Sequence, residues 1–294
     1  MKLINLEQGS EAWHKFRKSH IGASEISMIM GSNPWKTAYE LWLEKTDRVK
    51  PKKANKAMQR GSDMEETALH EFISQSKRFY EPKVGVYSKW EVASASFDGI
   101  SEDHKHIAEV KVPMEKSYND MLENGVPLYY YHQTQWQIMV TEKAIQNDLF
   151  VFASEDLNFS HSVFPNKELH DEMLLEAKKF WHCIQNDVPP ELTEKDHLLI
   201  TDDYQLSVLA SNYLESDELN KASESAKKAN REALTAYVGG KNIKGYGIKV
   251  TSNKGRKTLN LEKLKLDYGI SEESLQKYYT TGKSFVTVSK SGNS

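Results

Sequence analysis

The segment Ala93–Met114, ASASFDGISEDHKHIAEVKVPM, decides how we interpret the rest of the chain. Asp98 lies at the end of one β-prone stretch, and the triplet Glu109-Val110-Lys111 lies in the next. Because side chains alternate between the two faces of a strand, Glu109 and Lys111 should point the same way while Val110 points into the core. Two carboxylates and one amine are therefore expected at one edge of a small sheet.

This group of side chains suits a hard divalent cation held by oxygen ligands, with an ammonium beside it to stabilise charge that develops on a phosphate. The spacing Asp-x10-Glu-x-Lys also arises by chance. The alternative is an Asp-Gly turn that joins two strands, followed by an exposed Glu/Lys pair. The sequence around the segment decides between the two interpretations.

The composition is that of a globular, water-soluble chain. Of its 294 residues, 38% are hydrophobic and 28% are charged, which is sufficient for a sizeable core. We see no apolar signal-peptide region and no stretch that approaches ~18 apolar residues, so we expect a cytoplasmic protein without a membrane span. The single cysteine, Cys183, excludes an intramolecular disulfide and a cysteine-rich metal site.

Charge is distributed unevenly along the chain. The net charge is −3, yet residues 241–294 hold 11 Lys and Arg against 4 Asp and Glu. A basic end on an acidic body suits a negatively charged partner approached from one side. It equally suits a solvated surface, and the sequence leaves both interpretations open.

Residues 1–190 are predicted to form a domain in which helices, then strands, then helices follow one another. Apolar periodicity predicts short helices within residues 9–46, with Ser24 at the N-cap of one of them. Further helices are expected over residues 61–79, 115–124, 128–142 and 166–186, and strands over 83–88, 92–97, 107–112, 148–153 and 159–164. The fold class is thus α/β (α+β), a central mixed β-sheet flanked by helices.

Pro189-Pro190 is the predicted domain boundary, because proline ends a helix. Residues 191–294 are expected to form a C-terminal extension. It should contain a long Ala-rich helix over 204–238, a hairpin over 243–259 that turns at 253–255, a short helix, and a last strand over 284–289. The long helix has only a thin apolar stripe, too weak for a core of its own.

Four blocks of the sequence resemble, in order and spacing, the YqaJ-type viral recombinases. These are relatives of the phage lambda exonuclease within the PD-(D/E)xK nuclease superfamily. The blocks are EQGSEAWHKFRKSHIGASEI, GSDMEETA, SFDGI with AEVK, and PLYYYHQTQWQIMVT. Four blocks in the right order are far more specific than the Asp/Glu/Lys spacing alone, and they imply a restriction-endonuclease-like core.

The resemblance implies a site for two catalytic Mg²⁺ ions, for which Mn²⁺ should substitute. Asp98, Glu109, Glu65 and the carbonyl of Val110 are the implied metal ligands. Lys111 is implied to orient or activate the attacking water. Oxygen ligands of this kind are those that Mg²⁺ prefers.

The resemblance also implies residues that contact the substrate. Gln133 matches the glutamine block beside the family's active site, and Arg17 and Ser24 match residues that cradle a 5′-phosphate. Arginine can hold a terminal phosphate with two parallel hydrogen bonds. Arg17 could instead pair with Glu11, and Gln133 could satisfy buried backbone groups. The further candidates for contact with DNA are Trp13, Trp35 and Gln135, although both tryptophans would also suit the core.

The implied function is a Mg²⁺-dependent 5′→3′ exonuclease acting on linear double-stranded DNA. It would leave a 3′ single-stranded overhang for a single-strand annealing protein in phage-type recombination. The family assembles as rings, so a closed homo-oligomer, a trimer by resemblance, is expected. Two alternatives stay open: an endonuclease with the same metal site, and a non-catalytic module that binds DNA ends.

Overall fold

The structure is a computed structural model that describes residues 1–51, 56–197, 199–238, 243–245, 248–250 and 261–275. The chain divides into two compact units, Met1–Leu198 and Leu199–Ser294. The predicted boundary at Pro189-Pro190 lies after the last helix of the first unit, within the segment that leads to this division. The two units are described separately.

A six-stranded sheet with the strand order β1-β2-β3-β4-β5-β6 forms the centre of the first unit. The strands are β1 (Lys2–Ile4), β2 (Glu81–Tyr87), β3 (Trp90–Ile100), β4 (His106–Lys111), β5 (Gln146–Ser154) and β6 (Leu157–Val163). β4 and β5 run parallel, and the other neighbouring strands run antiparallel. The parallel pair requires a long crossover, which contains two helices, so the predicted mixed sheet is confirmed.

The helices of the first unit are α1 (Glu11–Lys18), α2 (Ala23–Ile29), α3 (Ala38–Lys45), α4 (Lys56–Ser76), α5 (Glu115–Asn124), α6 (Leu128–Thr141) and α7 (Lys167–Gln185). Ser10, Thr37 and Asn166 each accept a first-turn backbone N–H at the start of α1, α3 and α7, as N-cap side chains do. The prediction of Ser24 as an N-cap is wrong. α2 starts after Gly22, because the side chain of Glu25 accepts the Gly22 N–H at 2.9 Å.

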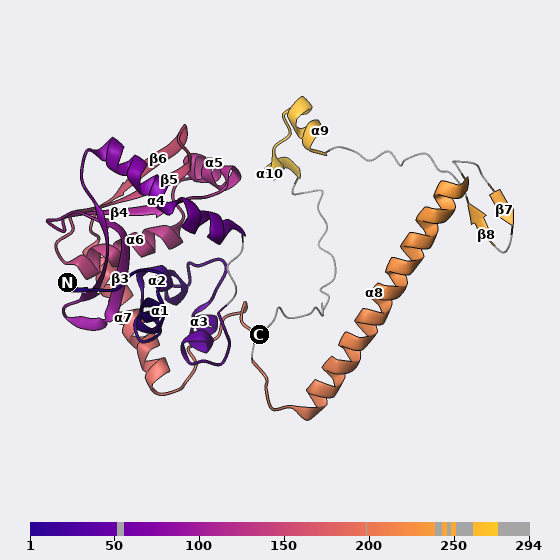
Figure 1. The fold of residues 1–294 in the computed structure, drawn as a ribbon, viewed down its shortest axis with the longest axis horizontal. Coiled ribbons are helices and arrows are strands. Elements are labelled where there is room, and N and C mark those ends of the chain that lie inside the picture. The colour runs from indigo at the N-terminus through magenta and orange to yellow at the C-terminus, as the bar shows by residue number, and fades with distance from the viewer. Residues whose placement is uncertain (52–55, 198, 239–242, 246–247, 251–260, 276–294) are drawn as a thin grey trace. The chain divides into compact units, whose positions relative to one another are not determined.

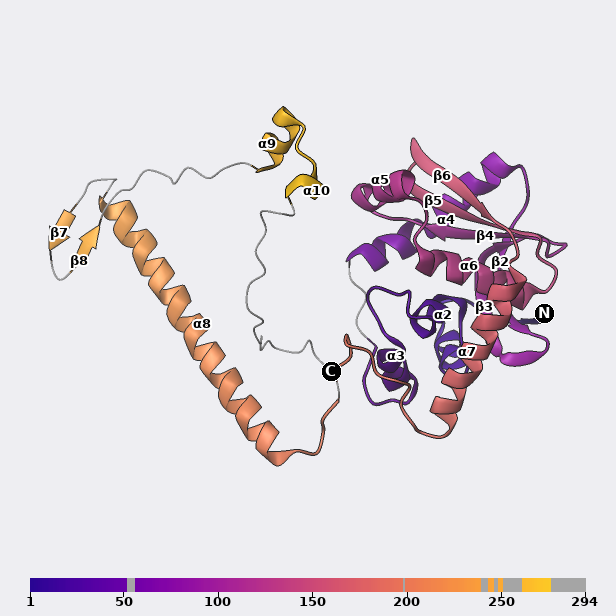
Figure 2. The same cartoon turned by 180° about the vertical axis from the view of Figure 1, so that it is seen from behind.

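Helices cover both faces of the sheet (Figures 1 and 2). Val110 and Phe150 pack with Phe72 of α4, whereas Leu149 of the same strand as Phe150 packs with Tyr118 of α5. This alternation follows from the two-residue period of a strand, and the prediction that Val110 points into the core is confirmed. The largest cluster lies between the sheet and α2, α3, α6 and α7, and it includes Ile26, Trp42, Phe97, Trp136 and Phe180.

Asp98 and Gly99 lie inside β3, so the alternative interpretation of an Asp-Gly turn is wrong. The glycine serves packing instead. A Cβ at Gly99 would lie 2.8 Å from Tyr80 Cβ and 3.1 Å from Leu69 Cδ1 of α4. Glycine in a strand permits such a close approach, and here it brings α4 close to β3.

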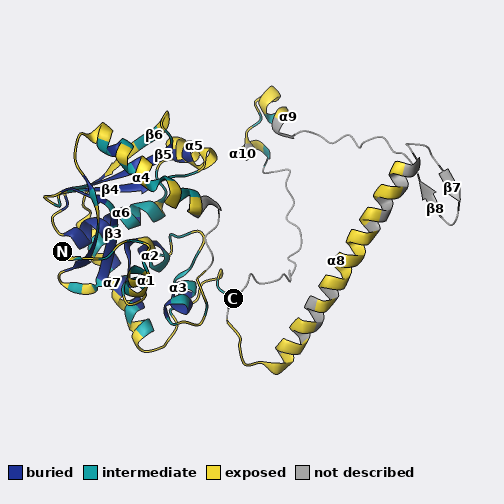
Figure 3. Ribbon diagram, in the orientation of Figure 1, coloured by how far each residue is buried: buried dark blue, intermediate teal, exposed yellow. Residues whose placement is uncertain are grey.

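The second unit contains α8 (Tyr204–Val238), β7 (Ile243–Gly245), β8 (Ile248–Val250), α9 (Leu261–Tyr268) and α10 (Glu272–Leu275). Figure 3 colours the described residues of α8 as exposed. β7 pairs with β8 in the register Ile243↔Val250, so the chain reverses before the predicted turn at 253–255. That turn and the predicted strand over 284–289 lie outside the described residues. In the described part of the chain, no helix is both long and apolar enough to cross a membrane.

Candidate active site

A cavity of about 170 Å³ brings together side chains from distant parts of the first unit. Its walls come from α1, α2, α4, α6 and the strands β3 and β4. Eight of the residues predicted from the sequence line it, together with Trp13: Arg17, Ser24, Glu65, Asp98, Glu109, Val110, Lys111 and Gln133. The predicted carboxylate residues and the residues predicted to bind a phosphate therefore line the same cavity.

The cavity forms where β3 and β4 move apart. The strands pair at Ile100↔Ile107 and Gly99↔Ala108. Beyond Gly99, a side chain replaces the backbone as the acceptor: Asp98 Oδ2 accepts the backbone N–H of Val110 at 2.8 Å. This hydrogen bond, in which a carboxylate replaces a backbone carbonyl, fixes the position of Asp98 in the wall of the cavity.

Glu109 is held by donors from two elements. Its side chain is 2% exposed. Oε1 accepts from Lys111 Nζ and from Gln133 Nε2, each at 2.5 Å, and Oε2 accepts from Gln137 Nε2 at 2.5 Å. A buried carboxylate requires such donors, and these leave it little freedom to turn. The predicted proximity of Glu109, Lys111 and Gln133 is thus present in the structure.

Gln137 is a site residue that the sequence reasoning missed. It is fully buried, donates to Glu109, and accepts from Asn147 Nδ2 at 2.7 Å. It lies four residues after Gln133 on α6, and residues at this spacing share one face of a helix. That spacing was a usable signal in the sequence.

Burial and neighbouring carboxylates raise the pKa values of Asp98 and Glu65. Burial, and then the charges of Glu109 and Glu65, raise the pKa of Asp98 well above its ordinary value. Burial, and then Glu109, raise the pKa of Glu65, while Lys111 opposes the rise. Burial alone would lower the pKa of Lys111, but Glu109 and Asp98 hold it above the ordinary value. Lys111 therefore stays protonated at neutral pH.

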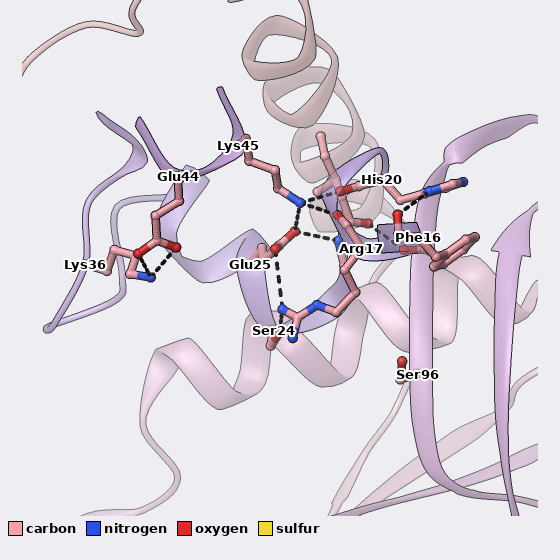
Figure 4. Close-up of polar contacts among 12 residues, drawn as sticks. Phe16, Arg17, His20, Ser24, Glu25, Lys36, Glu44, Lys45 and Ser96 are labelled. Atoms are coloured by element: carbon pink, nitrogen blue, oxygen red, sulfur yellow. Dashed lines mark hydrogen bonds and ion pairs between the residues drawn. The ribbon is translucent and has the colours of Figure 1, made fainter. Parts of the chain in front are cut away.

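Arg17 lies at the end of α1 and lines the same cavity (Figure 4). Its Nη2 donates to Ser24 Oγ at 3.1 Å and lies 3.4 Å from Glu25 Oε1. The guanidinium also lies 4.8 Å from the centre of the Trp13 ring, a distance typical of cation–π contacts. The carboxylate beside Arg17 is thus Glu25, and the alternative pairing with Glu11 is wrong.

Glu25 and Lys45 form a buried ion pair behind Arg17 (Figure 4), which the sequence analysis did not predict. Glu25 Oε2 lies 2.8 Å from Lys45 Nζ. Burial would raise the pKa of Glu25, but Lys45 and Arg17 together hold it below the ordinary value. Lys45 Nζ also donates to the backbone carbonyls of Arg17 and His20, at 2.6 and 2.5 Å.

The sequence of the site-bearing region matches one known family. Residues 12–144, which include every residue of the cavity from Trp13 to Gln133, match the model of the YqaJ-like viral recombinase domain. This part of the chain is similar to the YqaJ-like viral recombinase domain. The resemblance noted in the sequence is thereby confirmed, and the domain lies within the first unit.

Relatives of the YqaJ-like domain occur in bacteria and viruses. The uncharacterized protein YqaJ of Bacillus subtilis is 26% identical over 239 residues, which cover 80% of this chain and 72% of YqaJ. An uncharacterized protein of Acanthamoeba polyphaga mimivirus is 27% identical over 165 residues, 48% of this chain and 28% of the viral protein. The chain thus spans under a third of this longer viral relative.

A solved structure has the same fold as the first unit. The alkaline exonuclease LHK-Exo from Laribacter hongkongensis matches with a TM-score of 0.54 and 20% sequence identity. The match covers 60% of this chain and 94% of the exonuclease. The predicted fold class, a mixed sheet with flanking helices as in phage-type exonucleases, is confirmed by this likeness.

The side chains of the cavity fit a divalent cation by their chemistry. Glu65, Asp98 and Glu109 offer carboxylate oxygens in one cavity, and a bound cation would oppose the rise in the pKa values of Glu65 and Asp98. Within the described residues, no three or more His, Cys, Asp or Glu side chains already converge on a metal position. The Glu109 oxygens are instead occupied by Lys111, Gln133 and Gln137.

The candidates for further contact with DNA fall into three different environments. Trp13 lines the cavity and donates through Nε1 to Ser96 Oγ at 2.9 Å. Trp35 is 66% exposed, so its alternative placement in the core is wrong; its ring lies edge-on to Tyr129, 5.0 Å between centres. The prediction for Gln135 is wrong, because it is fully buried and bonded to Phe164 O, at 2.7 Å, and the Asn166 N–H.

Proposed function

We propose that this chain is a metal-dependent exonuclease that hydrolyses one strand of linear double-stranded DNA in the 5′→3′ direction and leaves a 3′ single-stranded tail. The observation that carries the proposal is the shared cavity, in which Asp98, Glu109 and Lys111 lie together with Arg17 and Ser24. The first group suits phosphodiester hydrolysis, and the second suits a terminal phosphate. An anchor for a terminal phosphate beside the hydrolytic group favours cleavage that starts at a strand end.

The roles of the side chains follow from their contacts. Lys111 is protonated and lies beside the Glu109 carboxylate, where it can stabilise the negative charge that develops on the cleaved phosphate. Gln133 and Gln137 hold Glu109 in place. Glu65, Asp98, Glu109 and the Val110 carbonyl would hold two Mg²⁺ ions, which supply charge neutralisation and a nucleophile at neutral pH. Mn²⁺ would substitute for them.

The known proteins support this proposal. LHK-Exo is an alkaline exonuclease, and the family that matches residues 12–144 is described as a viral recombinase domain. An exonuclease that exposes a 3′ tail fits recombination by strand annealing. The direction of digestion is taken from the family resemblance, since the described contacts of the cavity are compatible with either polarity.

The proposed partners follow from the same reasoning. The substrate is a double-stranded DNA end, and the product strand would pass to a single-strand annealing protein. A closed homo-oligomeric ring, a trimer by resemblance, would keep the enzyme on its substrate during successive cleavages. The basic residues 241–294 would add contacts to the DNA backbone, whose contribution falls as salt rises.

The deciding experiment is digestion of a linear duplex that carries a 5′-phosphate on one strand and a 5′-hydroxyl on the other, with Mg²⁺ or with EDTA. We expect Mg²⁺-dependent release of nucleotides from the phosphorylated strand while its partner strand stays intact. A closed circular duplex should stay uncut. Cleavage of the circle would instead support an endonuclease, and end binding without any cleavage would support a non-catalytic module.

A further inference from the structure

We propose that the buried Glu25–Lys45 ion pair positions Arg17 for contact with a terminal phosphate and thereby sets the preference of the cavity for 5′-phosphorylated DNA ends. This inference rests on the proposed function. Glu25 and Lys45 would act as positioning residues, because Arg17 and not the pair reaches the cavity.

The ion pair holds Arg17 at both of its ends. Lys45 Nζ donates to the backbone carbonyl of Arg17 at 2.6 Å, and Glu25 Oε1 lies 3.4 Å from the Arg17 side-chain nitrogen Nη2. Glu25 Oε2 joins the two halves, since it lies 2.8 Å from Lys45 Nζ and accepts the Gly22 N–H at 2.9 Å. The end of α1, the start of α2 and the end of α3 are thus fixed at one point (Figure 4).

The exposure of the three side chains separates positioning from binding. The side chains of Glu25 and Lys45 are 8% and 4% exposed, whereas that of Arg17 is 32% exposed. Ser24 and Glu25 both contact Nη2, and Trp13 covers the guanidinium plane. Within the described residues, Nη1 and Nε have no hydrogen-bond partner, so the N–H groups of these two nitrogens can donate to an incoming phosphate.

The charges of Arg17, Glu25 and Lys45 explain why a lysine is needed beside Glu25. Glu25 alone would cancel the charge of Arg17 and weaken its attraction for an anion. With Lys45 beside Glu25, the three side chains carry a net charge of about +1, which an anion near Arg17 experiences. The pair therefore holds Arg17 with a carboxylate and leaves the cluster attractive to phosphate.

Stability by itself does not account for this arrangement. Burying two charges costs about as much as their attraction returns, and well-packed apolar side chains are often equally stable. Both ends of the pair contact Arg17, the residue whose position decides phosphate binding. The contacts of Glu25 and Lys45 instead suit the positioning of the Arg17 side chain.

The test uses the full chain and two duplexes that differ only in a 5′-phosphate or a 5′-hydroxyl. For Glu25→Gln, we expect the ratio of the two kcat/KM values to fall about tenfold towards one, the size of effect of a lost charge-assisted hydrogen bond. The fall should appear as a higher KM on the phosphorylated duplex with kcat retained. Glutamine can still accept the Gly22 N–H, so the start of α2 is preserved.

Glu25→Gln separates positioning from simple electrostatics. The variant removes a negative charge beside Arg17, so electrostatics alone would strengthen phosphate binding, whereas loss of position weakens it. Glu25→Asp, which keeps the charge beside Lys45 but shortens the reach to Arg17, carries the test if Glu25→Gln does not fold. Glu44→Gln is the matched control. Glu44 lies on the same helix as Lys45, but it pairs with Lys36, at 2.7 Å, away from Arg17 (Figure 4).

The outcomes distinguish this inference from the proposed function. An unchanged or higher phosphate/hydroxyl ratio in Glu25→Gln and Glu25→Asp, in a chain that digests DNA, overturns the positioning role alone. A wild-type chain that digests neither duplex overturns the proposed function. In that case the affinities of the two duplexes, measured by fluorescence anisotropy in EDTA, still decide the role of the pair, and equal affinities in the wild type overturn it.

Discussion

Gln137 donates its side-chain amide to Glu109 across 2.5 Å, in a part of the domain where both side chains are buried. The same glutamine accepts from Asn147 at 2.7 Å, and Gln133, one helical turn earlier, holds the other oxygen of Glu109. The carboxylate is therefore clamped by α6. A catalytic group is useful only when its geometry is fixed in this way.

Replacing Gln137 with leucine should damage both stability and activity. Leucine would leave Glu109 Oε2 without a donor and one N–H of the Asn147 amide without an acceptor, since Asn147 keeps only its bond to the Thr134 carbonyl, and each buried unsatisfied group costs about 1–3 kcal/mol. We expect the free energy of unfolding, measured by urea denaturation, to fall by about 2–4 kcal/mol. Gln133→Leu is the control: it also removes a donor to Glu109, but Oε1 keeps its hydrogen bond from Lys111 and the side chain of Gln133 is only half-buried, so it should cost less stability. Equal losses in the two variants would contradict the clamp.

Lys111→Ala should lower the rate of hydrolysis by about 10²–10³-fold if Lys111 stabilises the transition state. The lysine stays protonated beside Glu109 and Asp98, and its charge is the one removed. Single-turnover digestion at saturating enzyme separates this effect from binding. Affinity for DNA ends should change little, because Arg17 and Ser24 are untouched. Undiminished hydrolysis would exclude the role assigned to Lys111.

Asp98→Asn should stabilise the metal-free chain at neutral pH. Burial and the charges of Glu109 and Glu65 raise the pKa of Asp98 in the folded state. A carboxyl with a raised folded pKa contributes stability below its unfolded pKa, and that contribution is lost as pH rises through the folded pKa. At neutral pH the ionised group is therefore unfavourable, and its removal should raise Tm by about 2–4 °C, equivalent to ~1 kcal/mol.

The effect of Mg²⁺ on Tm provides a second test of Asp98→Asn. A cation that binds the folded state raises Tm by mass action, so Mg²⁺ should raise the Tm of the wild type and have much less effect on Asp98→Asn. Differential scanning fluorimetry in Mg²⁺ and in EDTA reads both effects. Glu66→Gln is the control, because Glu66 is the exposed neighbour of Glu65. Equal Mg²⁺ shifts in wild type and Asp98→Asn would exclude Asp98 as a ligand.

Glu25→Gln should change how stability depends on acid. The folded-state pKa of Glu25 is held below its ordinary value of 4.5, which burial alone would raise, by Lys45 and Arg17. The sign is therefore opposite to that of Asp98: the stabilising contribution is present above the unfolded pKa and is lost as pH falls through the folded pKa. Urea unfolding at several pH values should show a shallower loss below about pH 4.5 in the variant. A loss as steep as in the wild type would contradict this coupling.

Trp35→Ala should weaken DNA binding without affecting the fold. The side chain is 66% exposed, and its ring forms a T-shaped pair with Tyr129, so the change in stability should stay within about 0.5 kcal/mol. If a base stacks on the indole, affinity for DNA with a single-stranded end should fall by about 1–3 kcal/mol. Gln135→Ala provides the contrast, since this buried residue should affect stability first. Unchanged affinity in Trp35→Ala would remove Trp35 from the DNA-contacting surface.

Much of the fold could be predicted because its patterns are local. The helix over 204–238 and the strands around Asp98 and Lys111 follow from periodicity and from turn and cap residues. β1 was missed because three residues at a sheet edge carry little pattern, and its pairing with β2 joins parts of the chain some eighty residues apart. Ser24 was misplaced as an N-cap because the cap comes from Glu25 reaching back to Gly22.

The candidate site divides in the same way. Glu65, Asp98, Glu109 and Lys111 could be found because family blocks surround them, and the structure places them in one cavity. Gln137 was missed although its four-residue spacing from Gln133 was a usable signal, whereas Lys45 could not be found, because its ion pair with Glu25 depends on tertiary contacts that leave no fixed spacing. Gln135 shows the opposite error, since its neighbour Gln133 points to the cavity and Gln135, two residues on, lies on another face of the same helix.

Gly99 sets the distance between the strand that carries Asp98 and the helix that carries Glu65, although it has no functional group itself. Its missing side chain lets β3 lie against Tyr80 and against Leu69 of α4, and Leu69 lies one helical turn from Glu65. An alanine at position 99 would act as a spacer that displaces the helix carrying Glu65 from the strand carrying Asp98. The gap between these two carboxylates can thus be adjusted while every ionisable group is kept, which offers a way to test the proposed metal site by geometry alone.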